Sequence, residues 1–212
     1  MSAQSQVRKF NAVVLENLPE MTKDVMQGWI ENPSGLQKAL RSALVPSQDG
    51  NEPKEVQQPL LTKRAAVRVE GAKRFVADET SLKEANVGWT GVNFDQFFLG
   101  KVEENVEDTI LAIHCLEKRS LDAPIRKELG QNREEIALTH FFDLLKKQSK
   151  GQKEHLLVNG CANIAYIRDK NGTLWAVRAR WDSDRRCWDV RAPSVEDPRG
   201  WDDGRLVLSR DC

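Results

Sequence analysis

The side chains that most often carry catalysis or bind metals are scattered along this chain. The histidines His114, His140 and His155 lack metal-ligand spacing with one another and with the four cysteines. His140 falls on the polar side of a predicted helix, so we expect it to be solvated. The cysteines form no C-x-x-C pair and are too sparse for a disulfide-rich scaffold, which favours reduced thiols. We therefore expect no metal site.

Acid–base and nucleotide-binding motifs offer no better enzyme candidate. The paired carboxylates Glu103-Glu104 and Glu134-Glu135 are typical of helix starts and solvated faces. The chain has no P-loop, no G-x-G-x-x-G after a strand and no G-x-S-x-G. An enzyme that uses Cys161 or Cys187 is the remaining catalytic alternative, and we rank it last. The sequence favours binding over catalysis, with no cofactor and no catalytic residue.

Arginine together with tryptophan is the one combination that suggests a ligand type, and it is concentrated in residues 171–212. This stretch holds eight arginines and four of the six tryptophans, Trp175, Trp181, Trp188 and Trp201. Such residues can bind single-stranded nucleic acid through phosphate contacts and base stacking. However, seven aspartates and one glutamate balance the arginines, and phosphate binding needs a net positive surface. A nucleic-acid-binding module using Arg and Trp is therefore the alternative function and not the first.

Residue composition changes sharply at the start of this stretch. Residues 1–170 contain 15 Lys, 11 Gln and 16 Glu, so at the same density residues 171–212 would hold about ten of these types. They hold one, Glu196. A GC-rich gene would favour Arg over Lys throughout, yet residues 1–170 have 15 Lys against 9 Arg. A surface hairpin can hold Arg and Asp by chance, but it would not usually exclude Lys, Glu and Gln together.

The missing types share a property of the genetic code, because no codon for Lys, Gln, Glu, Met or Trp ends in a pyrimidine. At one set of positions, which we call the slots, every residue has at least one codon that ends in a pyrimidine, whatever its first two bases are. The intervening residues, which we call the frame, follow the lattice W-x6-W-x-V-x-A-x-S-V-E-x-P-x-x-W-x-x-G. This pattern is expected when the adenines of AAC or AAT asparagine codons are mutated. The slots are Arg178, Arg180, Asp182, Ser183, Asp184, Arg185, Arg186, Cys187, Asp189, Arg191, Pro193, Asp197, Arg199, Gly200, Asp202, Asp203, Arg205 and Leu206.

The elements that carry these residues divide into three parts. Residues 1–45 read as helical, because one apolar stripe ends at Asn32-Pro33 and a second begins after it. Residues 46–62 contain three prolines and little apolar content, which predicts a linker. Residues 63–212 form the main domain. Two short helices bury little surface alone, so they form either an appendage that binds a constant partner or a flap that docks on the main domain, and we favour the appendage.

Within the main domain, residues 109–117 predict a strand, a helix runs from Asp122 to Gly130, and residues 133–149 give the strongest helical pattern. In the rest of the chain the pattern predicts strands, at 156–158, 164–167, 174–181, 188–192 and 206–208. Asn171-Gly172 predicts a type I′ turn, and residues 182–186 predict a second hairpin turn. The order of one strand, two helices and about four antiparallel strands predicts an α+β domain.

The framework outside the slots resembles the target proteins of diversity-generating retroelements, which mutate adenines at the 3′ end of a target gene. The segments RFVADETS, FFLGKVEE, SLDAPIRKELG, LLVNGCANIAYIRDKNGTLWAV and LVLSR are similar to an uncharacterised group of such variable proteins from candidate-phyla bacteria. The likeness runs from about Val76 to the end, more than half of the chain. The two-helix N-terminus resembles modules that are joined to several such target domains.

The resemblance implies a C-type lectin-like fold that displays its variable residues on the last strands and loops. It also implies a ligand-binding or display protein whose slots contact a protein or other macromolecule. Strand alternation suits this function, since Trp188, Val190 and Ala192 would share the buried face while Asp189 and Arg191 face the ligand. The mixture of Arg and Asp favours a polar or mixed-charge partner, most simply a protein.

The N-terminal segment MSAQSQVRKF has no apolar h-region, and no apolar run approaches the length of a membrane span. We therefore expect a cytoplasmic protein with no membrane partner. Export by a route that needs no signal peptide stays open. The net charge of zero gives no bulk attraction to nucleic acid or to a membrane surface.

Overall fold

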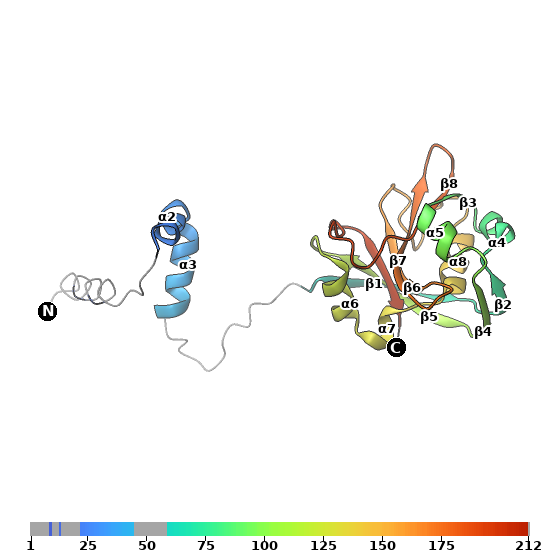
Figure 1. Cartoon of the computed structure of the whole chain (residues 1–212), viewed down its shortest axis with the longest axis horizontal. Helices are drawn as coiled ribbons and strands as arrows, with labels where there is room; N and C mark the ends of the chain where they lie inside the picture. The colour runs from blue at the N-terminus through green and yellow to red at the C-terminus, as the bar shows by residue number, and fades with distance from the viewer. Residues whose placement is uncertain (1–8, 10–12, 14–21, 45–58, 212) are drawn as a thin grey trace. The chain divides into compact units, whose positions relative to one another are not determined.

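The structure, a computed structural model, describes residues 9, 13, 22–44 and 59–211 (Figure 1). The chain divides into two compact units, Met1–Gln57 and Gln58–Cys212, and each is described by itself. The predicted helical segment before residue 22 and most of the predicted linker lie outside the described residues. The last two residues of the predicted linker, Leu61 and Thr62, belong to the first strand of the second unit.

The first unit contains two described helices, α2 (Lys23–Glu31) and α3 (Pro33–Leu44). Asn32 ends one and caps the other, since its side-chain oxygen accepts the backbone N–H of Gly35 at 2.9 Å. Proline suits the first position of α3 because a backbone N–H there would have no partner within the helix. Apolar side chains of these helices remain in solvent, and Ile30 is 69% exposed.

The second unit is an α+β domain built on a seven-stranded sheet of order β1-β5-β9-β6-β7-β8-β3. Adjacent strands are antiparallel except β6 with β9 and β3 with β8, which are parallel. The prediction that the C-terminal strands form one antiparallel set is therefore wrong for β9. The strands are β1 (Leu61–Val69), β3 (Val87–Thr90), β5 (Thr109–Leu116), β6 (Asn163–Arg168), β7 (Leu174–Asp182), β8 (Cys187–Arg191) and β9 (Leu206–Arg210).

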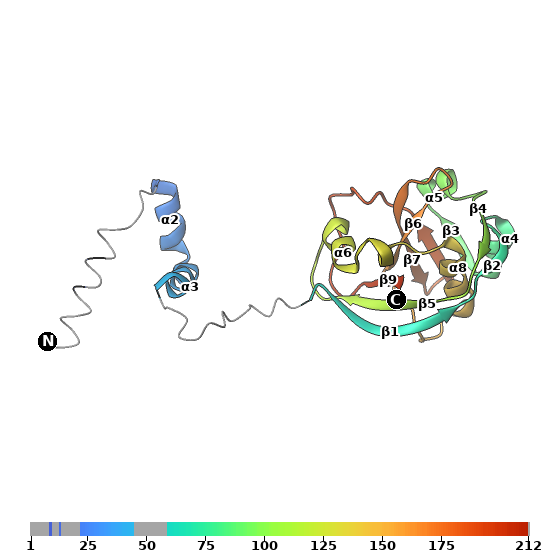
Figure 2. The same ribbon diagram turned by 90° about the horizontal axis from the view of Figure 1, so that it is seen from below.

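A smaller antiparallel pair and five helices complete this unit. Figures 1 and 2 place α6 on one side of the unit and α4 with β2 on the opposite side. Much of this material lies between β1 and β5. The additional elements are β2 (Ala72–Val76), β4 (Val102–Val106), α4 (Glu79–Glu84), α5 (Val92–Phe97), α6 (Asp122–Leu129), α7 (Gln131–Glu134) and α8 (Leu138–Lys147).

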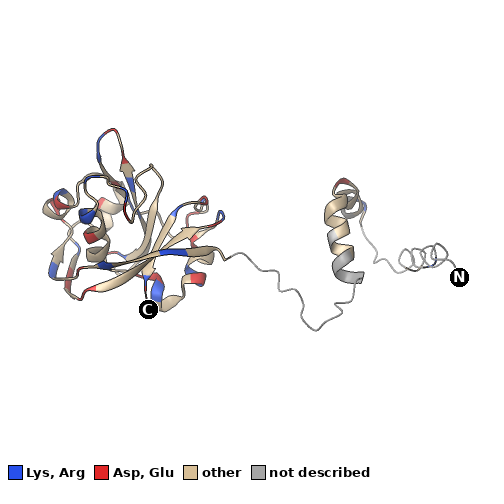
Figure 3. Cartoon of the chain, turned by 180° about the vertical axis from the view of Figure 1, so that it is seen from behind, with Lys and Arg blue, Asp and Glu red and all other residues tan. Residues whose placement is uncertain are grey.

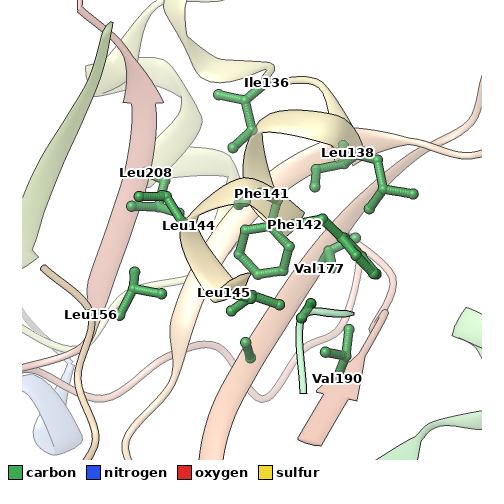
Figure 4. Close-up of a cluster of buried hydrophobic side chains, with 14 of the residues drawn as sticks. Ile136, Leu138, Phe141, Phe142, Leu144, Leu145, Leu156, Val177, Val190 and Leu208 are labelled. Carbon is green, nitrogen blue, oxygen red and sulfur yellow. The ribbon is translucent and has the colours of Figure 1, made fainter. Parts of the chain in front are cut away.

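Both faces of the main sheet are buried, each in its own hydrophobic cluster. The first cluster joins α8 to β7 and β8, and Figure 4 shows α8 side chains among residues of these strands, of β9 and of the following loop: Phe141, Leu144, Leu145, Leu156, Val177, Val190 and Leu208. The second cluster joins α6 to the other face through Ile125, Tyr166 and Trp201. Val177 and Ala176 are neighbours in β7 but belong to different clusters, as strand alternation requires.

The helix predicted at 133–149 is broken into α7 and α8. Glu135 is extended, with φ of −92° and ψ of 133°, and the backbone N–H of Ile136 donates to the carbonyl of Tyr166 at 3.1 Å. The prediction of a solvated His140 is also wrong. His140 is 7% exposed, and its Nε2 lies 2.9 Å from the carbonyl oxygen of Glu107. The loop between β4 and β5 covers that side of α8, which helical periodicity alone cannot reveal.

Two strand-region predictions also need correction. Residues 156–158 form a loop, in which Leu156 is buried because the Gln148 side chain bonds its backbone N–H and carbonyl, both at 2.9 Å. The hairpin between β6 and β7 exists, but its turn is not type I′. Gly172 has φ of 84°, whereas Asn171 does not have a positive φ. The Asp169 carboxylate fixes this turn by accepting the backbone N–H of Asn171 at 2.8 Å.

Candidate ligand-binding surface

The β7–β8 hairpin places frame and slot residues on opposite faces. Arg178 lies opposite Arg191, Arg180 lies opposite Asp189, and Trp181 lies opposite Trp188. Residues directly opposite in an antiparallel pair point to the same side of the sheet. Trp188, Val190 and Ala192 are buried, whereas Asp189 is half-buried and Arg191 is exposed. The alternation predicted for residues 188–192 is confirmed.

Two frame tryptophans pack against each other beneath this hairpin. The rings of Trp181 and Trp188 meet edge to face, with centroids 5.1 Å apart and planes at 75°. Trp188 is fully buried, and its indole Nε1 has no hydrogen-bond partner among the described residues. Packing alone therefore holds Trp188, without a polar anchor.

The third frame tryptophan is held by a buried polar cluster. The indole N–H of Trp201 donates to Oδ1 of Asp122 at 2.8 Å, and the hydroxyl of Tyr166 donates to the same oxygen at 2.7 Å. Burial raises the pKa of Asp122, and these hydrogen bonds and the nearby Arg126 only partly offset that effect. Trp201 and Ser120 also exchange backbone hydrogen bonds, which tie the slot-bearing loop at 193–205 to the start of α6.

The tip of the hairpin is a self-contained set of slots. The carboxylate of Asp182 accepts the backbone N–H groups of Asp184 and Arg185, each at 2.9 Å. These contacts, together with the Arg185 guanidinium, hold the pKa of Asp182 below its usual range. Arg185 also pairs with Asp189 at 2.7 Å. Arg186 adopts φ of 54°, a left-handed conformation that is uncommon for residues other than Gly, Asn and Asp.

The loop at 193–205 carries a second set of slots. Arg199 pairs with Asp197 at 2.7 Å, and this contact with the Arg199 backbone N–H lowers the pKa of Asp197 to about 2. Arg205 pairs with Asp202 at 3.2 Å. Each pair joins two slots, so much of the charge in this loop is neutralised within the surface.

Sixteen of the eighteen slots are exposed or half-buried, and the two exceptions are Cys187 and Leu206. Cys187 packs against Gly88 of β3, and burial raises the pKa of its thiol. Leu206 opens β9 and is 8% exposed. Gly200 is constrained in another way, because its φ is 64° and an added Cβ would lie 2.6 Å from the carbonyl oxygen of Ser120. Cys187 and Leu206 are therefore not displayed on the surface, and Gly200 lines the cavity at a position where a side chain would not fit without a backbone shift.

Slots from both strands and from the loop meet around one cavity of about 520 Å³. Seven further lining residues come from segments distant in sequence: the β3–α5 connection with Trp89, the start of α6 with Asp122, and the loop at Gly160. Nothing in the sequence pattern indicated these residues, because only the fold brings them together. Nine slots line the cavity: Arg178, Arg180, Arg191, Pro193, Asp197, Arg199, Gly200, Asp202 and Arg205.

Charge is balanced over the second unit as a whole, and Figure 3 shows acidic and basic residues spread across it. Around the cavity the balance is different. Arg178, Arg180 and Arg191 form no salt bridge with any residue that the structure describes. Burial, together with the charges of Arg191 and Arg180, lowers the pKa of Arg178 to about 10. The Arg191 guanidinium lies over the Trp89 ring, 4.6 Å from its centroid.

Within the described part of the chain, no three His, Cys, Asp or Glu side chains gather as a metal site would require. No helix in that part is long and apolar enough to cross a bilayer. Cys115, Cys161 and Cys187 are free thiols, and Cys161 lies 3.3 Å from a guanidinium nitrogen of Arg205. No family model, curated protein or solved structure matches this chain.

Proposed function

We propose that this protein binds a protein or other macromolecular ligand through a surface that a retroelement diversifies. The observation that carries the proposal is the spatial separation of slots from frame. Nine slots line one cavity, whereas the frame tryptophans Trp181 and Trp188 are buried and do not line it; Trp201 lines it but is only 8% exposed. The positions selected by the codon pattern are therefore mostly ones where a substitution leaves the hydrophobic core unchanged.

The rest of the domain is suited to hold such a surface rigid. Trp181 and Trp188 lock β7 to β8, and Trp201 anchors the slot-bearing loop through Asp122. The C-terminal β9 lies beside β5, which also pairs with β1 near the start of the unit. This return of the C-terminus to the sheet is compatible with the C-type lectin-like fold that the resemblance implies.

The alternative, a module that stacks single-stranded bases on tryptophan, finds less support. Base stacking requires an open ring face. Trp181, Trp188 and Trp201 are buried, and Trp175 stacks on Phe97 with centroids 4.8 Å apart. Trp89 is partly exposed, but Arg191 already lies over its ring. An enzyme using Cys187 is likewise disfavoured, because that thiol is buried and its pKa is raised.

The exposed apolar side chains Met26, Ile30 and Leu40 in α2 and α3 support a constant partner at the first unit. A cytoplasmic location is also part of the proposal. In this scheme the partner of the helices stays the same, whereas the partner of the slots differs from copy to copy.

Two small libraries in a protease-resistance display assay test the separation of slots from frame. One randomises the exposed slots Arg180, Asp184 and Asp202, and the other randomises Trp181 and Trp188. We expect most slot variants to keep a free energy of unfolding within about 0.5 kcal/mol of the parent. Replacing either tryptophan by alanine should cost about 3–5 kcal/mol. Equal loss of folded protein in both libraries would refute the proposal.

A further inference from the structure

Six of the seven arginines among the slots fall into two groups that the sequence does not distinguish, and the seventh, Arg186, lies at the hairpin tip. Arg185, Arg199 and Arg205 are each neutralised by an aspartate that is itself a slot. Such exposed ion pairs contribute little to stability. Because the two charges of each pair cancel, the pairs present little net charge to a ligand. The partners of these arginines, Asp182, Asp189, Asp197 and Asp202, are four of the eight acidic residues that made the stretch look balanced.

The second group is Arg178, Arg180 and Arg191, which share one wall of the cavity. Arg178 and Arg191 are directly opposite in register on β7 and β8, and Arg180 is two residues further along the same face. Like charges directly opposite each other destabilise a strand pair. The lowered pKa of Arg178 reflects that cost together with its burial. In the free protein this wall holds positive charge that the described residues do not compensate.

The geometry of this wall suits bound anions. The cavity of about 520 Å³ lies within the range of ligand pockets in proteins, about 300–1,000 Å³. The Arg191 guanidinium lies over the Trp89 ring, and its N–H donors are arranged in a planar fork. A guanidinium edge matches the two oxygens of a carboxylate.

Acidic residues in the lining limit which anions fit. The same cavity is lined by Asp122, Asp197 and Asp202. A nucleic-acid strand, with one charge per nucleotide, would bring phosphates close to these carboxylates. A protein segment with a short run of acidic residues can place its charges against the arginines and uncharged groups elsewhere. The tryptophans of the lining also offer little room for base stacking, because Trp201 is 8% exposed and Arg191 lies over the ring of Trp89.

We propose that the cavity of this copy binds an acidic protein segment, with at least two neighbouring Asp or Glu carboxylates held by Arg178, Arg180 and Arg191. The inference rests on the proposed function, and it names the ligand chemistry of the same surface. Binding neutralises the three guanidinium groups and removes the repulsion between β7 and β8.

Fluorescence polarisation with the full chain at low salt tests this inference. The probe is a labelled peptide with two adjacent glutamates between glycines, and its control carries glutamines instead. We expect saturable binding of the glutamate peptide and none of the glutamine peptide. Arg178→Gln and Arg191→Gln should each weaken binding about tenfold, as loss of one charge-assisted contact implies. Arg74→Gln removes an equal charge from β2, outside the cavity, and should leave binding unchanged.

Unfolding midpoints of the three variants establish that each is folded. The inference is overturned if the glutamate peptide does not bind, if Arg74→Gln weakens binding as much as the cavity variants, or if an oligothymidylate of equal charge binds more tightly. Inorganic phosphate at the same concentration should not displace the peptide, and displacement would assign a phosphate site. None of these outcomes alters the tolerance of slots to substitution, so the proposed function and its ligand class can fail separately.

Discussion

Arg178 and Arg191 lie directly opposite each other on adjacent antiparallel strands, and neither forms a salt bridge with a described residue. Arg178 is half-buried beside the cavity, where burial and its arginine neighbours lower its pKa to about 10. An arrangement of this kind weakens the free protein, because both guanidinium groups are charged at neutral pH. It indicates that these positions serve something other than stability.

Arg178→Gln is therefore expected to stabilise the domain. Removing a like-charge cross-strand pair should raise the free energy of unfolding by about 0.5 kcal/mol at low salt. The gain should shrink at 1 M salt, where the Debye length is about 3 Å. Urea denaturation of the parent, Arg178→Gln and the control Arg74→Gln measures this effect. Destabilisation of Arg178→Gln at both salt concentrations would show that the pair is not strained.

Asp122→Asn is expected to change how stability depends on pH. Burial raises the pKa of Asp122 in the folded protein, so the native state holds the proton more tightly than the unfolded chain does. The stability contributed by this group is fully present below the ordinary Asp pKa of about 3.9 and is lost as pH rises through the raised value. Asparagine can still accept from Trp201 and Tyr166, since both donate to Oδ1.

Chemical denaturation of wild type and Asp122→Asn at several pH values checks this. At pH 7 the variant should be at least as stable as wild type, and the two should converge below about pH 3.9. A variant that is less stable than wild type at pH 7 and equal to it at low pH would contradict the sign of the shift.

Trp201→Phe should destabilise more than Trp188→Phe, although Trp188 is the more deeply buried of the two. Trp201 is 8% exposed and Trp188 is 0% exposed. Trp201→Phe removes a hydrogen bond and leaves the buried Asp122 short of a donor, which costs about 1–3 kcal/mol beyond packing. Trp188→Phe removes an N–H group that has no partner within the described chain. Guanidinium denaturation of both variants tests the order, and the reverse order would mean that packing dominates.

Arg186→Asn should stabilise the hairpin tip. Arg186 has φ of 54°, and asparagine adopts this left-handed conformation more readily than arginine. We expect a gain of about 0.5–1 kcal/mol in the free energy of unfolding. Asp184→Asn, two residues earlier without a positive φ, is the matched control and should be neutral. Thermal unfolding of both variants measures the difference. The template inferred from the codon pattern encodes asparagine at both positions.

Regular patterns in the sequence predicted the structure correctly where residues close in sequence determine a residue's environment. The alternation at 188–192 and the helix from Asp122 to Gly130 depend on spacing within one element. The burial of His140 and the break at Glu135 depend on segments more than thirty residues away, Glu107 and Tyr166 respectively. Local periodicity carries no information about such contacts.

The same limit applies to the candidate site. The codon rule selected positions by composition, and it included Cys187, Leu206 and Gly200 because a codon does not record burial or a positive φ. It could not indicate Trp89 or Gly160, which complete the cavity from other elements. It also could not show that Arg185, Arg199 and Arg205 are paired while Arg178, Arg180 and Arg191 are not, because pairing depends on side-chain geometry.

Sequencing the genomic locus tests the central claim most directly. The account predicts pyrimidine-ending codons at the slots, with CGC or CGT for the arginines. It also predicts a near-identical template beside a reverse transcriptase gene, with adenines where the slots differ. AGA or AGG codons at several of the slot arginines would contradict it.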